Sequence, residues 1–255
     1  MTVMRSVFYV PANTPRFIQK APEFAADIVT LDLEDAVPRN LKAEARELAR
    51  ANLKHIASNG AQAYVRLNSY DTGMTDDDLD AIVCSDLDGV CLAKTTGAED
   101  VERLDAALTK LEKERGVPAG QIKISILLET AKGILNAGAA CQASPRVVSA
   151  IFGTVDFCRD MRLNRTAKGI EQSYARASVG IAARAAGIVA LDGPFADYKD
   201  MDMFKENLLD GKQMYGFEGR MIIHPSQIAA AHELYSPTAE EVEHARKVKV
   251  FFEED

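Results

Sequence analysis

Charged or polar residues follow almost every apolar, β-branched run of this chain, at the position where the run ends. These residues are Glu34, Asp35, Arg66, Lys94, Glu129, Asp156, Asp192 and His224. In a closed parallel (β/α)8 barrel the strand interiors pack the core, whereas the C-terminal strand ends and the following loops face the substrate. The pattern therefore predicts such a barrel, with its active site built from these run ends.

Eight strand-like runs alternate with helix-like segments. The strands are expected near residues 5–10, 27–33, 62–67, 88–94, 122–129, 147–153, 188–194 and 219–225. The clearest helical segments span residues 38–58, 98–115, 131–142, 170–186 and 200–214, and a last helix is expected over 237–255. This alternation implies a parallel sheet with right-handed crossovers, and no G-x-G-x-x-G follows the first strand. Because 255 residues suit one α/β barrel, we predict a single domain over 1–255.

Composition excludes several classes of protein. Hydrophobic residues make up 47% and charged residues 27%, which is typical of a soluble globular chain, and no apolar window reaches the length of a membrane span. The start, MTVMRSVFYVPAN, contains no signal-peptide cleavage motif, so a cytoplasmic protein is expected. A net charge of −8 argues against nucleic acid as a partner. The four cysteines form no C-x-x-C pair and are expected to be buried and reduced.

Two carboxylates are the strongest candidates for a metal site. Glu129 ends the run IKISILLE, and Asp156 follows the run VVSAIFG, one β/α unit later. Carboxylates on neighbouring strand ends can hold a hard divalent cation while water and substrate oxygens complete an octahedron, so Mg²⁺ is expected, with Mn²⁺ as the alternative. In the other interpretation, Glu129 caps a helix that begins near Thr130, and Asp156 is a loop residue.

Arg66 closes the run QAYVRL and offers a fork of donors to a carboxylate or a developing enolate oxygen. It could equally neutralise the acidic residues of LDLEDAV as an internal ion pair. Period-two alternation sends Asp32 and Glu34 to the same side and Asp35 to the other side or into the loop. These acids can tune pKa values, relay protons or orient water around a metal.

His224 lies in IIHPSQI with Pro225 opening the next helix, and a lone histidine is more often structural than catalytic. No G-x-S-x-G motif occurs, which disfavours covalent hydrolysis through a serine.

The chain resembles the citrate lyase β-subunit-like branch of the HpcH/HpaI aldolase/citrate lyase family, which includes citryl-, malyl- and citramalyl-CoA lyases. The matching segments are SVFYVPAN with PRF, DIVTLDLEDAVP, YVRLNSYDT, DGVCLAK, LLETAKGI, SPRVVSAIFGTVDF, LDGPFADYKD and GFEGRMIIHPSQI. They occur in the family's order and cover nearly the whole chain.

This resemblance implies a magnesium-dependent (β/α)8 barrel that assembles as a homotrimer or hexamer. It implies metal ligands at Glu129 and Asp156, enolate stabilisation by Arg66, and retro-Claisen cleavage of a 3-hydroxyacyl-CoA that carries a carboxylate on the hydroxyl carbon. Coenzyme A would be part of the substrate, with an acyl carrier protein as the alternative thioester carrier. The expected substrate- and CoA-binding residues are Tyr9, Arg16, Lys20, Arg66, His224 and Pro225.

The chain departs from the family's pattern at Ala12, Thr14, Ala93 and Val155. The change at Thr14 moves the expected phosphate contacts to Arg16 and Lys20. The C-terminal lid that supplies an acid/base aspartate in malyl-CoA lyases is also expected to be absent, which leaves Glu34 and Asp35 as internal candidates for that role. A thioesterase that uses the same site and a non-catalytic CoA-ester-binding or complex-forming subunit are the competing hypotheses.

Overall fold

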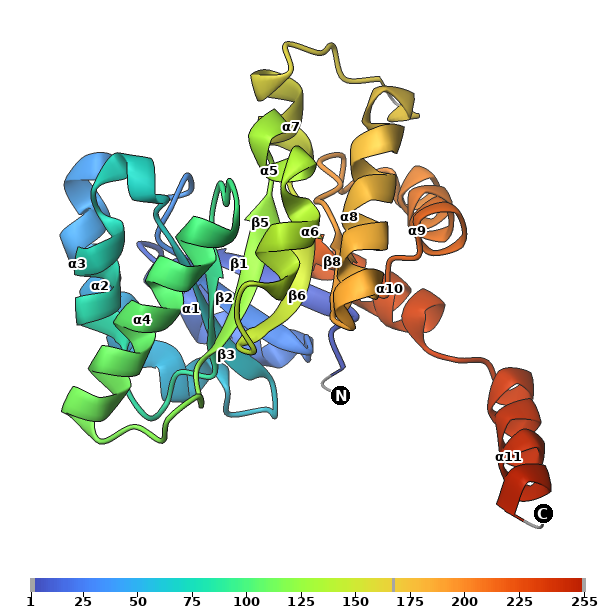
Figure 1. Ribbon diagram of the computed structural model, residues 1–255, viewed down its shortest axis with the longest axis horizontal. Coiled ribbons are helices and arrows are strands. Elements are labelled where there is room, and N and C mark those ends of the chain that lie inside the picture. Colours follow the sequence, from blue (N-terminus) through green and yellow to red (C-terminus); the bar gives the residue numbers. More distant parts are fainter. Residues whose placement is uncertain (1–2, 167, 254–255) are drawn as a thin grey trace.

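Eight parallel strands close into a barrel in the computed structural model, which describes residues 3–166 and 168–253 (Figure 1). The strands are β1 (Ser6–Pro11), β2 (Ile28–Asp32), β3 (Gln62–Leu67), β4 (Gly89–Leu92), β5 (Lys123–Leu128), β6 (Val147–Phe152), β7 (Val189–Asp192) and β8 (Gly219–Ile222). Each strand pairs in parallel with the next, and β8 pairs with β1. The predicted fold and all eight predicted strands are confirmed. Several strands end earlier than predicted, so most of the polar run ends belong to the loops.

The helices occupy the segments between the strands. The α-helices are α1 (Pro15–Lys20), α2 (Lys42–Ile56), α3 (Thr75–Ile82), α4 (Ala98–Arg115), α5 (Ala131–Leu135), α6 (Ala137–Gln142), α7 (Thr154–Asp160), α8 (Ser173–Ala186), α9 (Met201–Tyr215), α10 (Ile228–Tyr235) and α11 (Ala239–Glu253). Short 3-10 turns are η1 (Ala21–Phe24), η2 (Arg39–Leu41), η3 (Tyr70–Thr72), η4 (Ile170–Gln172) and η5 (Pro225–Gln227). These elements cover all the predicted helical segments.

Two predicted helices differ in detail from the structure. The segment 131–142 is divided into α5 and α6 at Asn136, whose side-chain amide donates a 2.8 Å hydrogen bond to the Thr96 carbonyl. The last helix is predicted to reach residue 255, but its final two positions lie outside the described residues. By contrast, α4 matches its prediction and ends at Gly116, whose φ of +67° is the left-handed conformation that glycine adopts without penalty.

The hydrophobic core has two parts that follow from strand alternation. Inward-facing residues fill the barrel, among them Val7, Tyr64 and Leu191, while outward-facing residues pack beneath the helices. Tyr64 closes over Gly89, where an added Cβ would lie 2.3 Å from the tyrosine ring. A packed interior of this kind leaves the open ends of the strands for chemistry.

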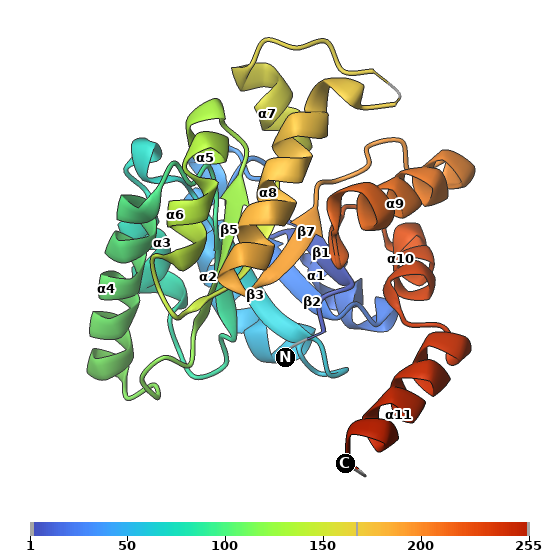
Figure 2. The same cartoon turned by 45° about the vertical axis from the view of Figure 1, so that its right-hand side comes forward.

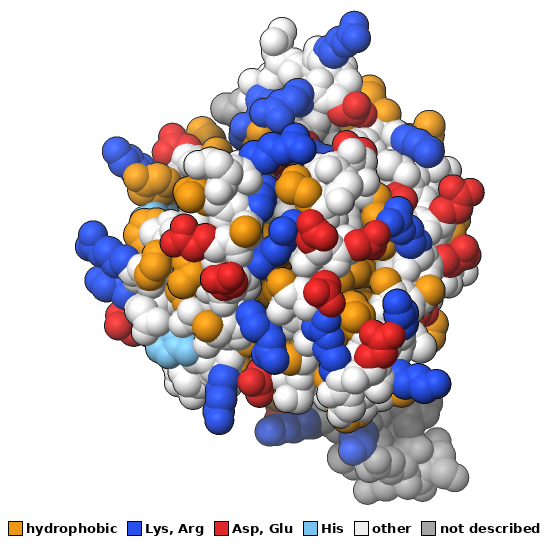
Figure 3. All heavy atoms as spheres, turned by 90° about the vertical axis from the view of Figure 1, so that its left-hand side faces the viewer, with side chains coloured by type: hydrophobic (Ala, Val, Ile, Leu, Met, Phe, Trp, Pro, Cys, Tyr) orange, Lys and Arg blue, Asp and Glu red, His pale blue; other side chains and the backbone are white. Residues whose placement is uncertain are grey.

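Helix α11 stands away from the barrel in both ribbon views (Figures 1 and 2). The single domain over 1–255 therefore stays a prediction. Within the described residues, no helix has the length and apolar character needed to cross a membrane. All four cysteines are buried and unpaired, as predicted. The face over α2 to α4 carries acidic and basic side chains intermixed with apolar ones (Figure 3).

Candidate functional site

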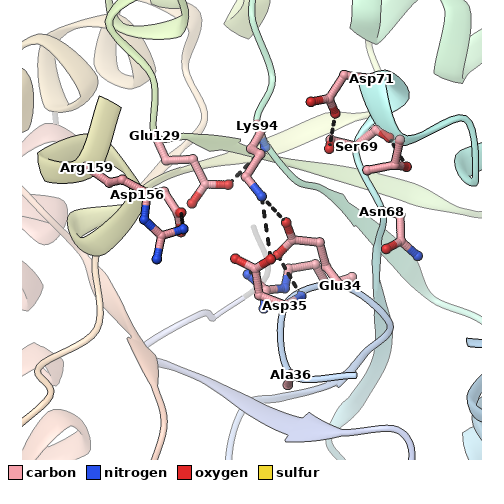
Figure 4. A network of polar contacts seen from close by, with 12 residues as sticks. Glu34, Asp35, Ala36, Asn68, Ser69, Asp71, Lys94, Glu129, Asp156 and Arg159 are labelled. Atoms are coloured by element: carbon pink, nitrogen blue, oxygen red, sulfur yellow. Dashed lines mark hydrogen bonds and ion pairs between the residues drawn. The ribbon is translucent and has the colours of Figure 1, made fainter. Parts of the chain in front are cut away.

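Polar side chains from five consecutive strand ends meet at the open C-terminal end of the barrel (Figure 4). They are Glu34 after β2, Arg66 in β3, Lys94 after β4, Glu129 after β5 and Asp156 in the first turn of α7. In a parallel barrel all C-terminal strand ends lie at one end, which explains why residues far apart in sequence converge. The structure thus brings together the residues that were predicted to bind metal and carry out catalysis.

Arg66 forms a buried ion pair with the acids of the β2 end. Its Nε and Nη2 lie 2.7 and 2.5 Å from the two carboxylate oxygens of Asp32, and its Nη1 lies 3.1 Å from Glu34 Oε2. Burial of Asp32 opposes ionisation, yet the Arg66 guanidinium holds the pKa of Asp32 below its ordinary value. The internal ion pair proposed for Arg66 is formed, and its role toward an enolate stays a prediction. Asp32 and Glu34 share one side, as the alternation predicts.

Lys94 is a site residue for which the sequence predicts no specific role. Its ammonium hydrogen-bonds to Glu34 and lies 3.6 Å from Asp35 Oδ1. Burial raises the pKa of Glu34 despite the two cations beside it, whereas the Asp35 side chain is half exposed. The backbone of Lys94 has a φ of +50°, a strained conformation for a residue with a side chain. Its position at the end of DGVCLAK was the available signal.

A second lysine, Lys42 of α2, positions the loop that carries Glu34. Its buried ammonium donates to the Leu33 and Glu34 carbonyls at 2.5 and 2.7 Å, and to Asn68 Oδ1 at 2.7 Å. These three acceptors satisfy the donors of the ammonium and tie the ends of β2 and β3 together. Lys42 was not predicted, because its helical position gives no local sign of this contact.

Glu129 is buried beneath the backbone of two neighbouring loops. The Lys94 amide donates to Glu129 Oε1 at 2.9 Å, and a Cβ on Gly153 would lie 2.3 Å from Glu129 Cβ. Burial raises the pKa of Glu129 to about 8; the Arg66 charge opposes the shift, while Glu34 and Asp156 add to it. The positive charge near Glu129 therefore does not offset the effect of burial.

The structure decides against the capping role of Glu129. The cap of α5 is Thr130, whose side chain accepts a 3.0 Å hydrogen bond from the Gly133 amide. Asp156 lies in the first turn of α7 and not in a loop, and Arg159 Nη1 lies 3.2 Å from its Oδ1. Both carboxylates are thus available for another purpose.

The donor set of Glu129 and Asp156 fits Mg²⁺, which prefers carboxylate oxygens and retains water or substrate oxygens. A cation would supply the positive charge that the raised pKa of Glu129 shows to be missing. Among the described residues, no group of three or more His, Cys, Asp or Glu side chains could hold a metal. Two protein carboxylates would therefore share such an ion with water and substrate.

The raised pKa of Glu129 predicts how stability depends on pH in EDTA. Between its ordinary pKa of 4.5 and about 8, the folded state retains a proton that the unfolded state has lost, so wild-type stability falls as pH rises. In Glu129→Gln this contribution is absent. We expect the variant to gain on the order of 3–4 kcal/mol over wild type between pH 5 and 8, measured by urea unfolding. Parallel pH profiles for the two proteins would contradict the pKa shift.

A cavity of about 360 Å³ lies beside this site, between β1, α1 and the turn after β8. Five of the predicted substrate- and CoA-binding residues line it: Tyr9, Arg16, Lys20, His224 and Pro225. The hydroxyl of Tyr9 points into the barrel, where it donates to Cys91 Sγ at 3.3 Å. The imidazole of His224 stacks on Tyr198 with ring centroids 4.2 Å apart. The structure brings these residues together, and their binding roles stay predictions.

Asp192 is the polar run end that the structure removes from the site. Because Leu191 faces the barrel interior, alternation turns Asp192 outward, toward the helices. There it pairs with Arg176 at 2.5 Å and lies 3.4 Å from Arg220. The prediction that Asp192 belongs to the active site was wrong, because only alternate residues of a strand face the barrel interior and its mouth.

The comparisons with known proteins agree with this geometry. The family model for HpcH/HpaI aldolase/citrate lyase matches residues 5–225. The chain belongs to this family. Citrate lyase subunit beta of Haemophilus influenzae is 34% identical over 248 residues, which cover 97% of this chain and 85% of that protein. A (3S)-malyl-CoA thioesterase of Cereibacter sphaeroides is 33% identical, with 98% of this chain and 83% of that protein covered.

A solved family structure extends the comparison to ligands. The protein CitE from Mycobacterium tuberculosis, in complex with magnesium, acetoacetate and coenzyme A, superimposes with a TM-score of 0.75 at 26% identity. The match covers 98% of this chain and 87% of that one. The predicted family and branch are confirmed, and these relatives support a lyase-family enzyme.

Proposed function

We propose that this protein is a magnesium-dependent carbon–carbon lyase that converts a citryl-, malyl- or citramalyl-CoA type of thioester into acetyl-CoA and a 2-oxo acid. The observation that carries the proposal is that Asp156 and the buried Glu129 lie together at the barrel mouth (Figure 4), close to Glu34 and its partner Arg66. The cavity lined by Arg16, Lys20 and His224 lies next to it and offers a place for the coenzyme. The family relatives support the same class of substrate.

Glu129 and Asp156 would hold Mg²⁺, whose charge would polarise the hydroxyl and carboxylate oxygens of the substrate. Glu34 accepts the hydroxyl proton, and the bond between the hydroxyl carbon and the adjacent methylene carbon breaks. The electron pair moves into the thioester as an enolate, and the hydroxyl carbon becomes the ketone of the 2-oxo acid. The same proton returns to the methylene carbon, so no other reactant is needed.

Arg66 would stabilise the enolate in this scheme. A guanidinium has five N–H donors, and its three contacts with Asp32 and Glu34 leave two for a ligand. The ion pair fixes the orientation of the fork before the substrate binds, which is the requirement for electrostatic stabilisation of a developing oxyanion. Asp35, on the exposed side of Lys94, is the second candidate for proton transfer.

Thioester hydrolysis at the same site is the second candidate function, because a malyl-CoA thioesterase is among the 33% identical relatives. In that reaction water attacks the thioester carbonyl and releases free CoA, with no cleavage of the carbon–carbon bond. The wholly non-catalytic subunit is the third possibility.

The test is to incubate the protein with citryl-, malyl- and citramalyl-CoA, with Mg²⁺ or EDTA, and to follow the products by mass spectrometry. Magnesium-dependent acetyl-CoA with one equivalent of a 2-oxo acid is the expected result, and it would also name the substrate. Free CoA with an intact hydroxy acid would replace the proposal with the thioesterase. Binding without turnover of any thioester would indicate the non-catalytic subunit.

The remaining proposals concern assembly and location. We propose that the chain forms a homotrimer or hexamer in the cytoplasm and uses Mg²⁺, with Mn²⁺ as a substitute. The thioester could be carried by an acyl carrier protein in place of CoA. Comparing the rates of turnover of the two thioesters would distinguish these carriers.

The basic residues of the CoA cavity lead to a kinetic prediction. Arg16 and Lys20 are exposed on α1 at the edge of this cavity, where they can contact coenzyme phosphates without reaching the reacting carbons. The double variant Arg16→Ala/Lys20→Ala is expected to raise KM for the CoA ester about tenfold and to leave kcat unchanged. Such contacts bind the ground state and the transition state equally, so their loss weakens binding without slowing the chemical step. The exposed Lys54→Ala is the control, and an unchanged KM in the double variant would place the coenzyme elsewhere.

A further inference from the structure

A second cavity, of about 330 Å³, lies between β7, β8 and the helices α8 and α9, and it borders the first turn of α7. Its lining includes Gln172, Arg176, Asp192, Asn207 and Arg220. The connections α7–α8 and β7–α9, which border it, lie at the same end of the barrel in Figure 2. The volume is enough for a small organic ligand.

The inner part of this cavity carries an excess of positive charge. Arg176 and Arg220 are both buried, and Asp192 is the acid between them. Arg176 uses both Asp192 oxygens, at 3.2 and 2.5 Å, and the Gly193 amide donates a further bond to this carboxylate at 2.9 Å. One carboxylate therefore serves two guanidinium groups, which leaves a net buried charge of one.

Arg220 retains hydrogen-bond donors without acceptors, although its guanidinium carbon lies 5.5 Å from the centre of the Phe204 ring. Its Nη2 donates to Asn207 Oδ1 at 2.7 Å, but within the described part of the chain its Nε and Nη1 have no hydrogen-bond acceptor. Nη1 lies 3.4 Å from Asp192 Oδ2, in an ion pair without a hydrogen bond. Burial lowers the pKa of Arg220, in keeping with this deficit. Buried charges of this kind are normally paired, because an unpaired one is costly.

We propose that this cavity binds a compact oxyanion, a carboxylate or a phosphate, which pairs with Arg220 beside Arg176. Guanidinium groups match the oxygen geometry of both anion types, and a bound anion would neutralise the excess charge. Two further acids line the cavity: Asp197 accepts a hydrogen bond from the Lys199 amide, and Asp200 accepts one from the Met203 amide in the first turn of α9. Among the described residues, neither acid forms a hydrogen bond or an ion pair with Arg176 or Arg220.

The first turn of α7 lies between this cavity and the candidate active site. Thr154 lines the cavity, and Asp156, a proposed metal ligand, lies in the same first turn of the helix. Thr154 also packs against Gly193, where an added Cβ would lie 2.2 Å from its hydroxyl. A bound anion would therefore lie against the turn that carries Asp156.

The test replaces the anion with a side chain of the protein. In Asn207→Asp, a carboxylate takes the place of the amide that already touches Arg220, with almost no change of shape. Isothermal titration in EDTA, at constant ionic strength set with NaCl, would measure binding of inorganic phosphate and of malonate. Wild type is expected to bind one of them saturably, whereas Asn207→Asp binds it at least about tenfold more weakly. The anion that binds identifies the class of ligand.

Two control variants locate the binding in this cavity. The exposed Asn40→Asp adds the same charge elsewhere and should bind like wild type. Glu129→Gln should also retain binding, because the cavity is distinct from the proposed metal site. A thermal melt in NaCl should show Asn207→Asp at least as stable as wild type, since the new carboxylate supplies the missing partner. Absence of saturable binding for both anions, equal binding in Asn207→Asp, or loss of binding in Glu129→Gln would overturn the proposal.

Discussion

Glu129→Gln is expected to lower the rate of thioester cleavage by about 10³-fold or more, because it removes one of the two proposed protein ligands of Mg²⁺. A metal that stabilises transition-state charge contributes several kcal/mol, and each 1.36 kcal/mol corresponds to a factor of ten in rate. The replacement is nearly isosteric, and the Gln oxygen can still accept the bond from the Lys94 amide. The fold of the variant should therefore remain intact. The gain in stability expected for this variant between pH 5 and 8 has the same implication.

The measurement combines kinetics with metal binding. Calorimetric titration with Mg²⁺ should show that the loss of activity accompanies a loss of metal affinity, and added Mg²⁺ should not restore the rate. Glu114→Gln is the matched control, since Glu114 is an exposed residue of α4 that pairs with Lys110 at 3.8 Å. Retention of both Mg²⁺ affinity and turnover in Glu129→Gln would remove Glu129 from the metal site.

Arg66→Met is expected to reduce both activity and stability. It leaves the buried Asp32 and Glu34 without their guanidinium partner, and removing one member of a buried pair costs about 3–5 kcal/mol. Loss of a donor to a developing oxyanion lowers kcat by about 10²–10³-fold. The loss of stability in this variant should be largest at pH values above the pKa of Asp32 in the unfolded state. Arg66 lowers the pKa of Asp32 in the folded state, so the pair stabilises the fold only where that carboxylate is ionised.

Arg66→Lys separates the two effects. Lysine keeps the positive charge but cannot form the two-point contact with Asp32, so stability should recover more than kcat. Urea unfolding below and above pH 3.8, together with steady-state kinetics, would measure both quantities. An Arg66→Met variant that is as stable as wild type would show that the ion pair contributes no net stability. Equal kcat values for wild type and the Arg66→Lys variant would show that charge alone is sufficient.

The sequence by itself determined the barrel and the position of the proposed metal site. Strand alternation and helix spacing are local patterns, so eight strands could be recognised without tertiary information. Glu129 directly follows the buried strand β5, and Asp156 lies four residues after the end of β6. Both were identified as candidates because a parallel barrel brings all such positions to one end. The family motifs carried the expectation of a CoA ester as substrate, which local patterns do not contain.

Only the tertiary structure decided which partner each charged side chain has. Arg66 pairs with Asp32, Lys42 reaches from α2 to the β2 loop, and Asp192 turns away from the mouth. These choices depend on side-chain direction and on segments distant in sequence, so no local pattern encodes them. The pKa of Glu129 is also a tertiary property, because it arises from burial and from the charges on three neighbouring elements. The unpaired hydrogen-bond donors of Arg220 are likewise a tertiary property, because they depend on how β8, α8 and α9 pack together.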